Sequence, residues 1–316
     1  MIVDQQAFED LARIHRRELH VHCYRMLGSV LDAEDLVQET LLKAWRGRAT
    51  FREQASPRTW LYRIATNACL SALARRPRRL LPEDLRPPRD EVAWLEPYPD
   101  MLLEAVADAS PGPEAVVDQR EATQLAFVAA LQHLAPRQRA VLLMRDVLGF
   151  TVAEVAEQLG TTREAVSSAH QRARTALEQR PRHGSAAATL TRAQQRLLEQ
   201  YVATWESGDL DGFVALLAHD VVLSMPPMAE WFAGRAAVHG FFAWAWGPAG
   251  PGPFRLLSTA ANMQPAFGLF GRSSDGDGFT PQAIQVLTLH GDRIGRLHGF
   301  VRPDLFTIFG LPSKLA

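Results

Sequence analysis

Apolar residues recur at helical spacing through the first 79 residues of this chain. The pattern predicts a first helix over 4–27, a second over 32–45 with Asp32 as its N-cap, and a third that begins at Ser56-Pro57. Serine is a favourable N-cap, and proline suits the first position of a helix. We therefore expect an all-α domain over residues 1–79.

A helix-turn-helix motif is predicted over residues 150–177. Thr151 and Glu154 fit a capping box that begins one helix, and Gly160 stands where a helix end needs a left-handed residue. Thr161 and Glu164 repeat the capping-box spacing and predict a second helix. Its inward positions are Val166, Ala169, Ala173, Ala176 and Leu177. Its outward positions are Arg163, Ser167, His170, Gln171 and Arg174, with Ser168 and Arg172 at the edges. Such a helix fits the major groove of DNA, whereas the alternative is an ordinary hairpin with a solvated basic face.

A different pattern begins after residue 180. Two helices are expected over 190–218, divided at Ser207-Gly208-Asp209, and a hairpin turn is expected at His290-Gly291-Asp292. Strand-like runs cover 221–225, 254–262, 266–270, 282–290 and 293–301. The order predicts an α+β domain with helices first and a curved antiparallel sheet after them. The whole is a multidomain chain with parts at 1–79, 80–118, 119–180 and 190–316.

Charge is segregated along the chain although the net charge is only −1. Residues 1–79 hold 14 Lys+Arg against 9 Asp+Glu, whereas residues 80–118 hold 2 against 10. A basic N-terminal block beside an acidic linker is compatible with nucleic-acid binding. The chain has no run of eighteen apolar residues and no apolar signal core at its start, so a cytoplasmic protein is expected. Cys23 and Cys69 are interpreted as reduced core thiols, and no pattern indicates a metal or cofactor.

The acidic linker contains an aromatic segment, Trp94-Leu-Glu-Pro97-Tyr98-Pro. Aromatic side chains in a polar tether tend to dock on a folded surface, so Trp94, Pro97 and Tyr98 are candidate docking residues. The alternative is a tryptophan that occurs by chance in a disordered segment.

Aromatic and basic residues also gather around the third helix. They are Phe51, Trp60, Arg63, Asn67 and Arg75. Rings that stack on exposed bases, beside arginines that hold phosphates, suit single-stranded DNA. For Trp60 alone, a place in the core is the stronger interpretation.

Three motifs in this order resemble bacterial sigma factors of the extracytoplasmic-function type. The motifs are DAEDLVQETLLKAW, PRTWLYRIATNACLSALARR and the segment from LQHLAPRQRA to QRARTAL. The resemblance covers roughly residues 5–180. It implies a protein that binds core RNA polymerase at the β′ clamp and the β flap, melts and recognises the −10 promoter element, and recognises the −35 element.

The resemblance also implies roles for individual residues. Asp35, Gln38 and Glu39 match the clamp-facing positions, for which the alternative is a solvated acidic helix face. Arg63 and Asn67 match the −10 helix, and residues 51–56 match a loop that captures a flipped base. The candidate −35 residues are Arg163, Ser167, Ser168, Gln171, Arg172 and Arg174. For each of these, the alternative is a phosphate contact or none.

Residues 190–310 are similar to the SnoaL-like, ketosteroid-isomerase-like cone. Sigma factors with such an extension form a group in which the added domain contacts the sigma domains and tunes activity. The resemblance implies the same arrangement for this chain. The related Asn-Pro-Asp-Lys-Leu motif aligns with residues 302–306, where its Asn and Lys are missing. Candidate pocket residues for an enzyme are Asp220, His239, His290 and His298, with Trp231, Trp244 and Met225 as walls.

These patterns favour a sigma factor that has no catalytic residues and no cofactor. Two other classes stay open. One is a one-component helix-turn-helix regulator that senses a ligand in the cone. The other is a cone enzyme with an attached DNA-binding module. Association with core polymerase discriminates the first from the sigma factor, and turnover of a hydrophobic small molecule identifies the second.

Overall fold

The structure of the protein is a computed structural model that describes residues 4–51, 56–75, 78–81, 93–103, 122–179, 190–248, 250–274 and 276–316. The chain divides into two units. We call Met1–Leu80 with Leu102–Arg182 the helical unit, and Leu81–Met101 with His183–Ala316 the C-terminal unit. None of the described helices is both long and apolar enough to cross a bilayer.

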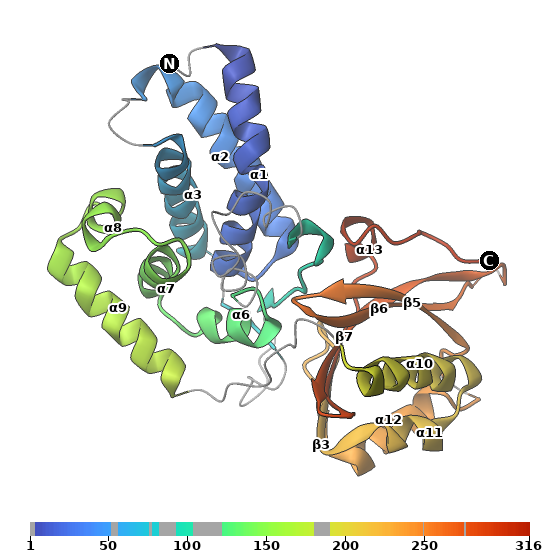
Figure 1. Cartoon of the computed structure of the whole chain (residues 1–316). Coiled ribbons are helices and arrows are strands. Elements are labelled where there is room, and N and C mark those ends of the chain that lie inside the picture. Colours follow the sequence, from blue (N-terminus) through green and yellow to red (C-terminus); the bar gives the residue numbers. More distant parts are fainter. Residues whose placement is uncertain are drawn as a thin grey trace. The chain divides into compact units, whose positions relative to one another are not determined.

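The first half of the helical unit is a bundle of three main helices (Figure 1). Its elements are α1 (Gln5–Leu27), α2 (Val30–Gly47), the 3₁₀ turn η1 (Arg48–Thr50), α3 (Pro57–Leu73) and the two-residue strand β1 (Arg79–Leu80). The predicted cap of the second helix was wrong. Ser29 is the N-cap of α2, because its hydroxyl accepts from the backbone N–H of Asp32 at 3.0 Å. Asp32 lies in the first turn instead, where its carboxylate pairs with Arg79 at 2.6 Å.

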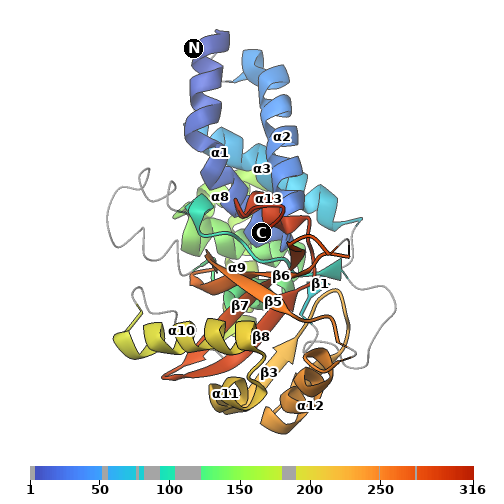
Figure 2. The ribbon, with the colours of Figure 1, turned by 90° about the vertical axis from the view of Figure 1, so that its right-hand side faces the viewer.

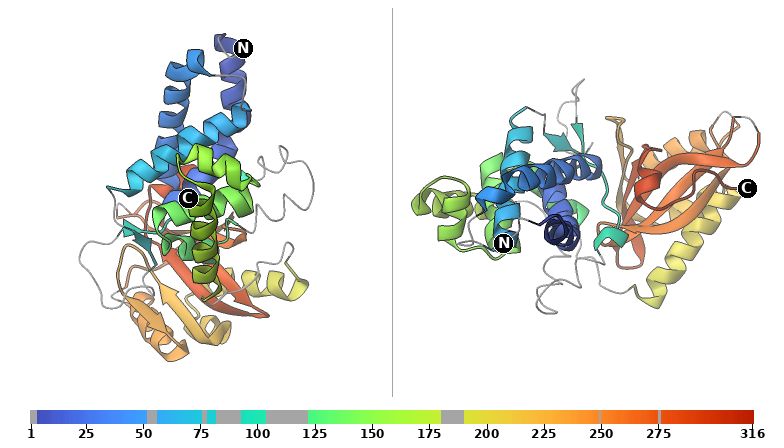
Figure 3. Two further views of the ribbon diagram at one scale, coloured as in Figure 1. Left: turned by 90° about the vertical axis from the view of Figure 1, so that its left-hand side faces the viewer. Right: turned by 90° about the horizontal axis from the view of Figure 1, so that it is seen from above.

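The second half of the helical unit contains the helix-turn-helix. Its elements are α6 (Leu125–Gln132), α7 (Pro136–Leu142), the π-helical turn η3 (Leu143–Val147), α8 (Val152–Gln158) and α9 (Arg163–Glu178). The capping box of Thr151 and Glu154 is confirmed, and Gly160 has the left-handed φ of 58° that its place requires. The second box was wrong by one residue: Thr162 is the N-cap, and its hydroxyl accepts from Ala165 N–H at 3.2 Å. Helices α8 and α9 lie at the periphery of this unit (Figures 1 and 3).

The C-terminal unit is an α+β fold around a six-stranded sheet. Its elements are β2 (Ala93–Trp94), α10 (Arg192–Ser207), α11 (Leu210–Ala215), β3 (Leu217–Ser224), β4 (Trp231–Ala233), α12 (Arg235–Ala245), β5 (Phe254–Ala261), β6 (Gln264–Arg272), β7 (Phe279–His290), β8 (Arg293–Phe300) and α13 (Leu305–Ile308). The strand order is β4-β3-β8-β7-β6-β5. Helices α10, α11 and α12 lie on one side of the sheet (Figure 2).

The expectation of a wholly antiparallel sheet needs one correction. Strands β3 and β8 pair in parallel, whereas the other neighbours are antiparallel. The parallel pair arises because β4, α12 and the long hairpins β5–β8 intervene between these two strands. Strand β4 and helix α12 were not predicted as elements. The hairpin turn at Gly291 is confirmed, with a φ of 64°.

Aromatic rings fill the space between the sheet and its helices. Trp205 of α10 packs against Phe213, Phe242, Trp246 and Phe254, with ring centroids 5.2–6.0 Å apart. Edge-to-face contacts of this kind are favourable beyond the apolar area that they bury. The space between the sheet and its helices is therefore filled mainly by apolar and aromatic side chains.

Candidate nucleic-acid interface

Helix α9 presents an unusually bare polar face. Only Val166 and Ala173 of its 16 residues are buried, and they hold the helix against the rest of the unit. All six candidate −35 residues are exposed: Arg163, Ser167, Ser168, Gln171, Arg172 and Arg174. Residues four apart on a helix lie on one face, so Arg163, Ser167 and Gln171 form a continuous line. A helix held by a narrow apolar stripe, with a basic face free, has the form that enters a major groove.

His170 differs from its predicted place on that face. Its Nε2 lies 2.6 Å from the carboxylate of Asp146 in η3, and its side chain is only 20% exposed. The sequence had no local signal for this pair, because the two residues are 24 positions apart. The contact orients α9 against η3 and so makes His170 a support of the polar face.

Helix α3 presents a much narrower polar face than α9. Arg63 and Asn67 are exposed and four residues apart, so their side chains share one side of the helix. Arg75 is exposed just beyond the C-cap Ala74. Trp60 is only 7% exposed, and its ring lies 5.0 Å from that of half-buried Phe51. This packing favours the core interpretation of Trp60, and residues 52–55 of the base-capturing loop lie outside the described residues.

An acidic and apolar face runs along α2. Asp35, Gln38 and Glu39 are exposed at helical spacing, and the large exposed side chain of Leu42 follows them one turn later. Glu39 pairs with Lys43 at 2.5 Å, and Gln38 donates to Glu34 at 3.1 Å. Exposed pairs of this kind contribute little to stability, so they leave the face available to a partner. Sequence reasoning had not included Leu42, although its i+7 spacing from Asp35 marks the same face.

Buried polar contacts join the two halves of the helical unit, and we call this set the polar seam. Arg139 of α7 is 2% exposed and donates to the carbonyl of Met26, in the last turn of α1. Gln132 of α6 donates to the carbonyl of Arg25, and Arg25 donates to the carbonyl of Ala122. The last carbonyls of a helix have no partner within it. Side chains of the second half therefore cap α1, and the cation also suits the negative end of the helix dipole.

A second, partly buried cluster fixes α3 against α1. The carboxylate of Glu18 accepts from Arg58 at 3.0 Å and from the Tyr62 hydroxyl at 3.1 Å. Burial alone would raise the pKa of Glu18, but the hydrogen bond from His15 and the charge of Arg58 hold it below its usual value. The ring of Phe150, two residues before α8, lies 5.9 Å from that of Tyr62. The Glu18 cluster thus supports the helix that carries Arg63 and Asn67.

Part of the acidic linker belongs to the C-terminal unit. The backbone N–H of Tyr98 donates to the side-chain oxygen of Asn262 at 2.8 Å, and Asn262 N–H donates to the Tyr98 carbonyl at 2.9 Å. Tyr98 and Pro97 are buried, whereas Trp94 is half-buried. Asp100 N–H donates to the carbonyl of Ala260 at 3.0 Å. Residues 95–101, which we call the docked segment, are therefore held by hydrogen bonds and by the burial of Pro97 and Tyr98.

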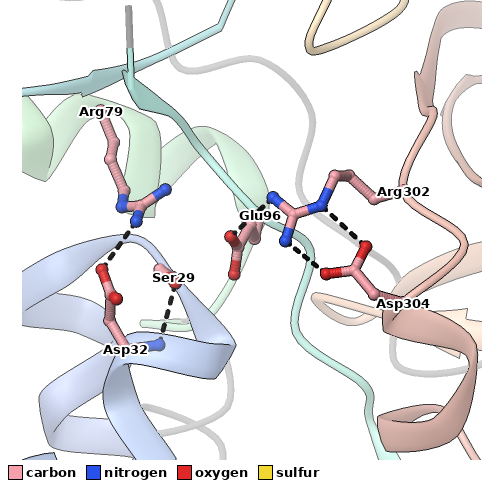
Figure 4. Close-up of polar contacts among 6 residues, drawn as sticks. All are labelled: Ser29, Asp32, Arg79, Glu96, Arg302 and Asp304. Carbon is pink, nitrogen blue, oxygen red and sulfur yellow. Dashed lines mark hydrogen bonds and ion pairs between the residues drawn. The ribbon is translucent and has the colours of Figure 1, made fainter. Parts of the chain in front are cut away.

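An ion pair adds to the docked segment (Figure 4). Arg302 donates to the carboxylate of Glu96 at 3.2 Å and to that of Asp304 at 2.6 Å. Hydrogen bonding to Asp304, and then the charge of Glu96, raise the pKa of Arg302. The pair lies in the 302–306 motif, where Arg302 occupies the position of the missing Asn. In this chain, Arg302 at the position of the missing Asn thus forms an ion pair with Glu96 of the docked segment.

The candidate catalytic residues of the cone do not converge. Asp220, His239 and His290 are exposed on three different elements. His298 is buried, and its Nδ1 lies 2.8 Å from the Ser224 hydroxyl, a partner that satisfies it within the sheet. Trp244, expected as a pocket wall, is 59% exposed. Across the described ranges, no group of three or more His, Cys, Asp or Glu side chains could hold a metal ion.

Three family models match the chain in order. They are Sigma-70 region 2 over residues 11–79, Sigma-70 region 4 over 124–177, and a SnoaL-like domain over 198–297. The ECF RNA polymerase sigma factor SigG of Mycobacterium tuberculosis is 46% identical over 316 residues, which span 95% of this chain and 83% of SigG. The chain belongs to the ECF RNA polymerase sigma factors. As a sigma factor, it binds core RNA polymerase and promoter DNA to initiate transcription.

A second relative of this sigma factor has a known structure. SigJ of Mycobacterium tuberculosis is 29% identical over 310 residues, covering 95% of this chain and 92% of SigJ. Its crystal structure matches with a TM-score of 0.61 over 97% of this chain and 99% of SigJ. The helical sigma domains and the C-terminal α+β domain of this sigma factor thus recur in SigJ. Region 2 corresponds to α1–α3, and region 4 to α6–α9.

Proposed function

We propose that this sigma factor uses three separate surfaces of its helical unit during initiation. The face of α2 around Asp35 and Gln38 binds the β′ clamp of core polymerase. The Arg63 and Asn67 side of α3 binds the melted −10 element, and the polar face of α9 binds the −35 element. The observation that carries the proposal is the bareness of α9: only two of its 16 residues are buried, so its basic polar face is accessible to DNA.

Association with polymerase tests the α2 surface. The variant Asp35→Ala/Gln38→Ala should bind purified core enzyme at least about tenfold more weakly, a loss of about 1.4 kcal/mol. Glu9→Ala removes an exposed acid from α1 and is the matched control. Equal binding of core polymerase by the double variant and the control would show that this face of α2 does not bind the polymerase.

Promoter footprints separate the two DNA surfaces. Arg163→Ala/Gln171→Ala should weaken protection of the −35 element, whereas Arg63→Ala/Asn67→Ala should leave that protection and reduce the permanganate reactivity of melted −10 thymines. Each lost base contact costs about 1–3 kcal/mol of discrimination. Arg192→Ala, an exposed arginine of α10, is the control for loss of positive charge. Identical footprints from the two double variants would contradict the proposal that α3 and α9 bind different promoter elements.

We further infer that the C-terminal unit tunes this activity by contact and not by catalysis. The chain runs from region 2 to region 4 through the docked segment, whose backbone is bound to Asn262 and Ala260 of the C-terminal unit. A tether bound in its middle spans a shorter distance than a free one of equal length. Docking therefore supports control over how far the two promoter-binding regions can separate.

Substitution of Asn262 in the full-length protein tests whether the docked segment regulates transcription. Asn262 has a φ of 54°, so Asn262→Gly keeps the backbone conformation and removes the acceptor of Tyr98 N–H. Met263→Gly makes the same change at the next position and keeps its bond to Asp100. Transcription by reconstituted polymerase should change with Asn262→Gly and stay at the parental level with Met263→Gly. Removing all residues after 190 should change transcription in the same direction; unchanged output from both variants would overturn the inference.

A further inference from the structure

The C-terminal unit has an open cavity of about 680 Å³ beside its aromatic interior. Helix α10 forms one wall with Leu198 and Val202, and the inner side of the sheet forms another with Phe267, Leu287 and Leu289. Cavities of about 300–1,000 Å³ with mostly apolar walls are typical sites for small molecules. The cavity therefore has the size and the apolar surface of a ligand site.

The charged groups around the cavity are all of one sign. Asp100 of the docked segment and Glu199 of α10 line it, whereas no Lys, Arg or His is among the lining residues that the structure describes. The lining amides already have partners: Gln194 closes the capping box of α10, and Gln264 donates to the Thr288 hydroxyl at 2.7 Å. Asp100 and Glu199 are the charged groups among the described lining residues, and their negative charge favours a cationic ligand; the Asp100 carboxylate also accepts from Met263 N–H.

The rim of the cavity is a strained turn that the docked segment supports. Asn262 and Met263 join β5 to β6 with φ of 54° and 61°, a left-handed region that residues with a side chain rarely occupy. Met263 N–H donates to the carboxylate of Asp100 at 2.9 Å, and Asn262 is bound to Tyr98. Asp100 therefore belongs both to the cavity wall and to the contact that holds the turn.

We propose that this cavity binds a small amphipathic organic cation, an alkyl or aryl amine. Its apolar part lies between α10 and the sheet, and its ammonium group lies near Asp100 and Glu199. Because Asp100 lines the site only when the segment is docked, the ligand binds the docked form more tightly. By linkage, occupancy stabilises the docked segment by the same factor.

Three probes of equal chain length test the ligand class by calorimetry on the full-length protein. n-Octylamine should bind at least about tenfold more tightly than n-octanoate, with n-octanol between them. Glu199→Gln and Asp100→Asn should each weaken octylamine binding about three- to tenfold and leave octanol unchanged. Asp211→Asn, an exposed acid of α11 outside the cavity, is the matched control. Equal affinity for octylamine and octanoate, or octylamine binding that neither substitution weakens, would overturn the proposal.

Two further measurements separate binding from its link to the docked segment. Ser258→Trp fills the cavity from exposed β5 without changing Asp100, and it should abolish octylamine binding. Hydrogen exchange of the Tyr98, Asp100 and Met263 amides should slow with saturating octylamine, and Ser258→Trp should remove that response. Saturation without slower exchange would overturn the linkage. Neither measurement needs polymerase or promoter, so both outcomes are independent of the promoter-binding proposal.

Discussion

Different interactions stabilise the interiors of the two units of this sigma factor. In the helical unit, the contacts between region 2 and region 4 include buried charged and polar side chains, with Arg139 at their centre. In the C-terminal unit, the corresponding space is filled by rings around Trp205 and Phe213. The junction between region 2 and region 4 thus combines directed hydrogen bonds with apolar contacts such as that of Tyr62 with Phe150, whereas the C-terminal unit relies mainly on apolar area and ring packing.

This difference determines how much free energy is lost when the contacts inside each unit separate. When the polar seam parts, water can replace the lost partners of the Arg139 guanidinium and of the Met26 and Arg25 carbonyls, because a hydrogen bond to water restores most of its value. Rings that leave a dry interior find no such replacement. Parting the polar seam therefore costs less than parting an apolar contact of the same area, whereas opening the ring cluster of the C-terminal unit exposes its apolar core to water.

The largest expected effect comes from breaking the aromatic interior. Trp205→Ala should lower the free energy of unfolding of the C-terminal unit by about 3–5 kcal/mol, because a large buried ring leaves a cavity. Trp244→Ala is a control of the same chemistry, since Trp244 is exposed, and it should change stability by less than about 0.5 kcal/mol. Urea unfolding followed by near-ultraviolet dichroism measures both. Equal effects of the two substitutions would show that the rings around Trp205 do not determine stability.

The polar seam should show the next largest effect. Arg139→Met removes the donor to the Met26 carbonyl and should destabilise the helical unit by about 3 kcal/mol, because buried acceptors lose their partner. Arg137→Met changes an exposed arginine two residues earlier and should be nearly neutral. Hydrogen exchange should accelerate at the end of α1 and in α6 and α7 in the first variant. Exchange that stays slow there would mean that the seam is held by apolar contacts alone.

Local signals explain most of what the sequence could predict. The capping box at Thr151, the left-handed Gly160 and the Ser56-Pro57 start of α3 each act within a few residues, so the helix-turn-helix and the bundle were predictable. Errors arose where two capping residues compete over a short distance, as with Ser29 and Asp32. The strongest local acceptor is decided by backbone conformation, which side-chain spacing does not reveal.

Long-range polar contacts were beyond prediction from pattern. Arg139 meets Met26 across 113 positions, and Tyr98 meets Asn262 across 164. Nothing in the periodicity of either segment marks the partner, because a backbone carbonyl has no sequence signature. The short strand β4 was missed for a related reason: three residues are too few for an alternating pattern. The exposed positions of α9 were predictable because buried residues in a helix recur every three to four positions.

Acid should weaken the helical unit through two buried histidines. Burial lowers the pKa of His22 to about 3 and that of His20 to about 4. Below about pH 6.5 the unfolded chain therefore binds more protons than the folded one, and stability falls as the pH falls. We expect a loss of about 1 kcal/mol per imidazole between about pH 7 and pH 5.5.

A histidine variant checks the source of this pH dependence. His22→Gln keeps a side-chain amide near the Thr66 hydroxyl, which lies 2.9 Å from His22 Nε2, and removes one of the two protonations. Urea unfolding at the two pH values should show roughly half the parental loss. The same loss in parent and variant would assign the acid sensitivity to other groups.

The smallest expected effect on stability comes from a helix cap, which, unlike the polar seam, involves only residues close in sequence. Thr151→Ala removes an acceptor of Glu154 N–H and breaks the capping box of α8, which should cost about 1 kcal/mol. Thr161→Ala changes the residue that spacing alone had marked as the next cap, and it should cost less because Thr162 performs that function. Thermal unfolding of the two single variants and of Thr162→Ala ranks the three threonines. A cost at Thr161 as large as that at Thr162 would mean that the helix can begin at either residue, and that the spacing rule was right after all.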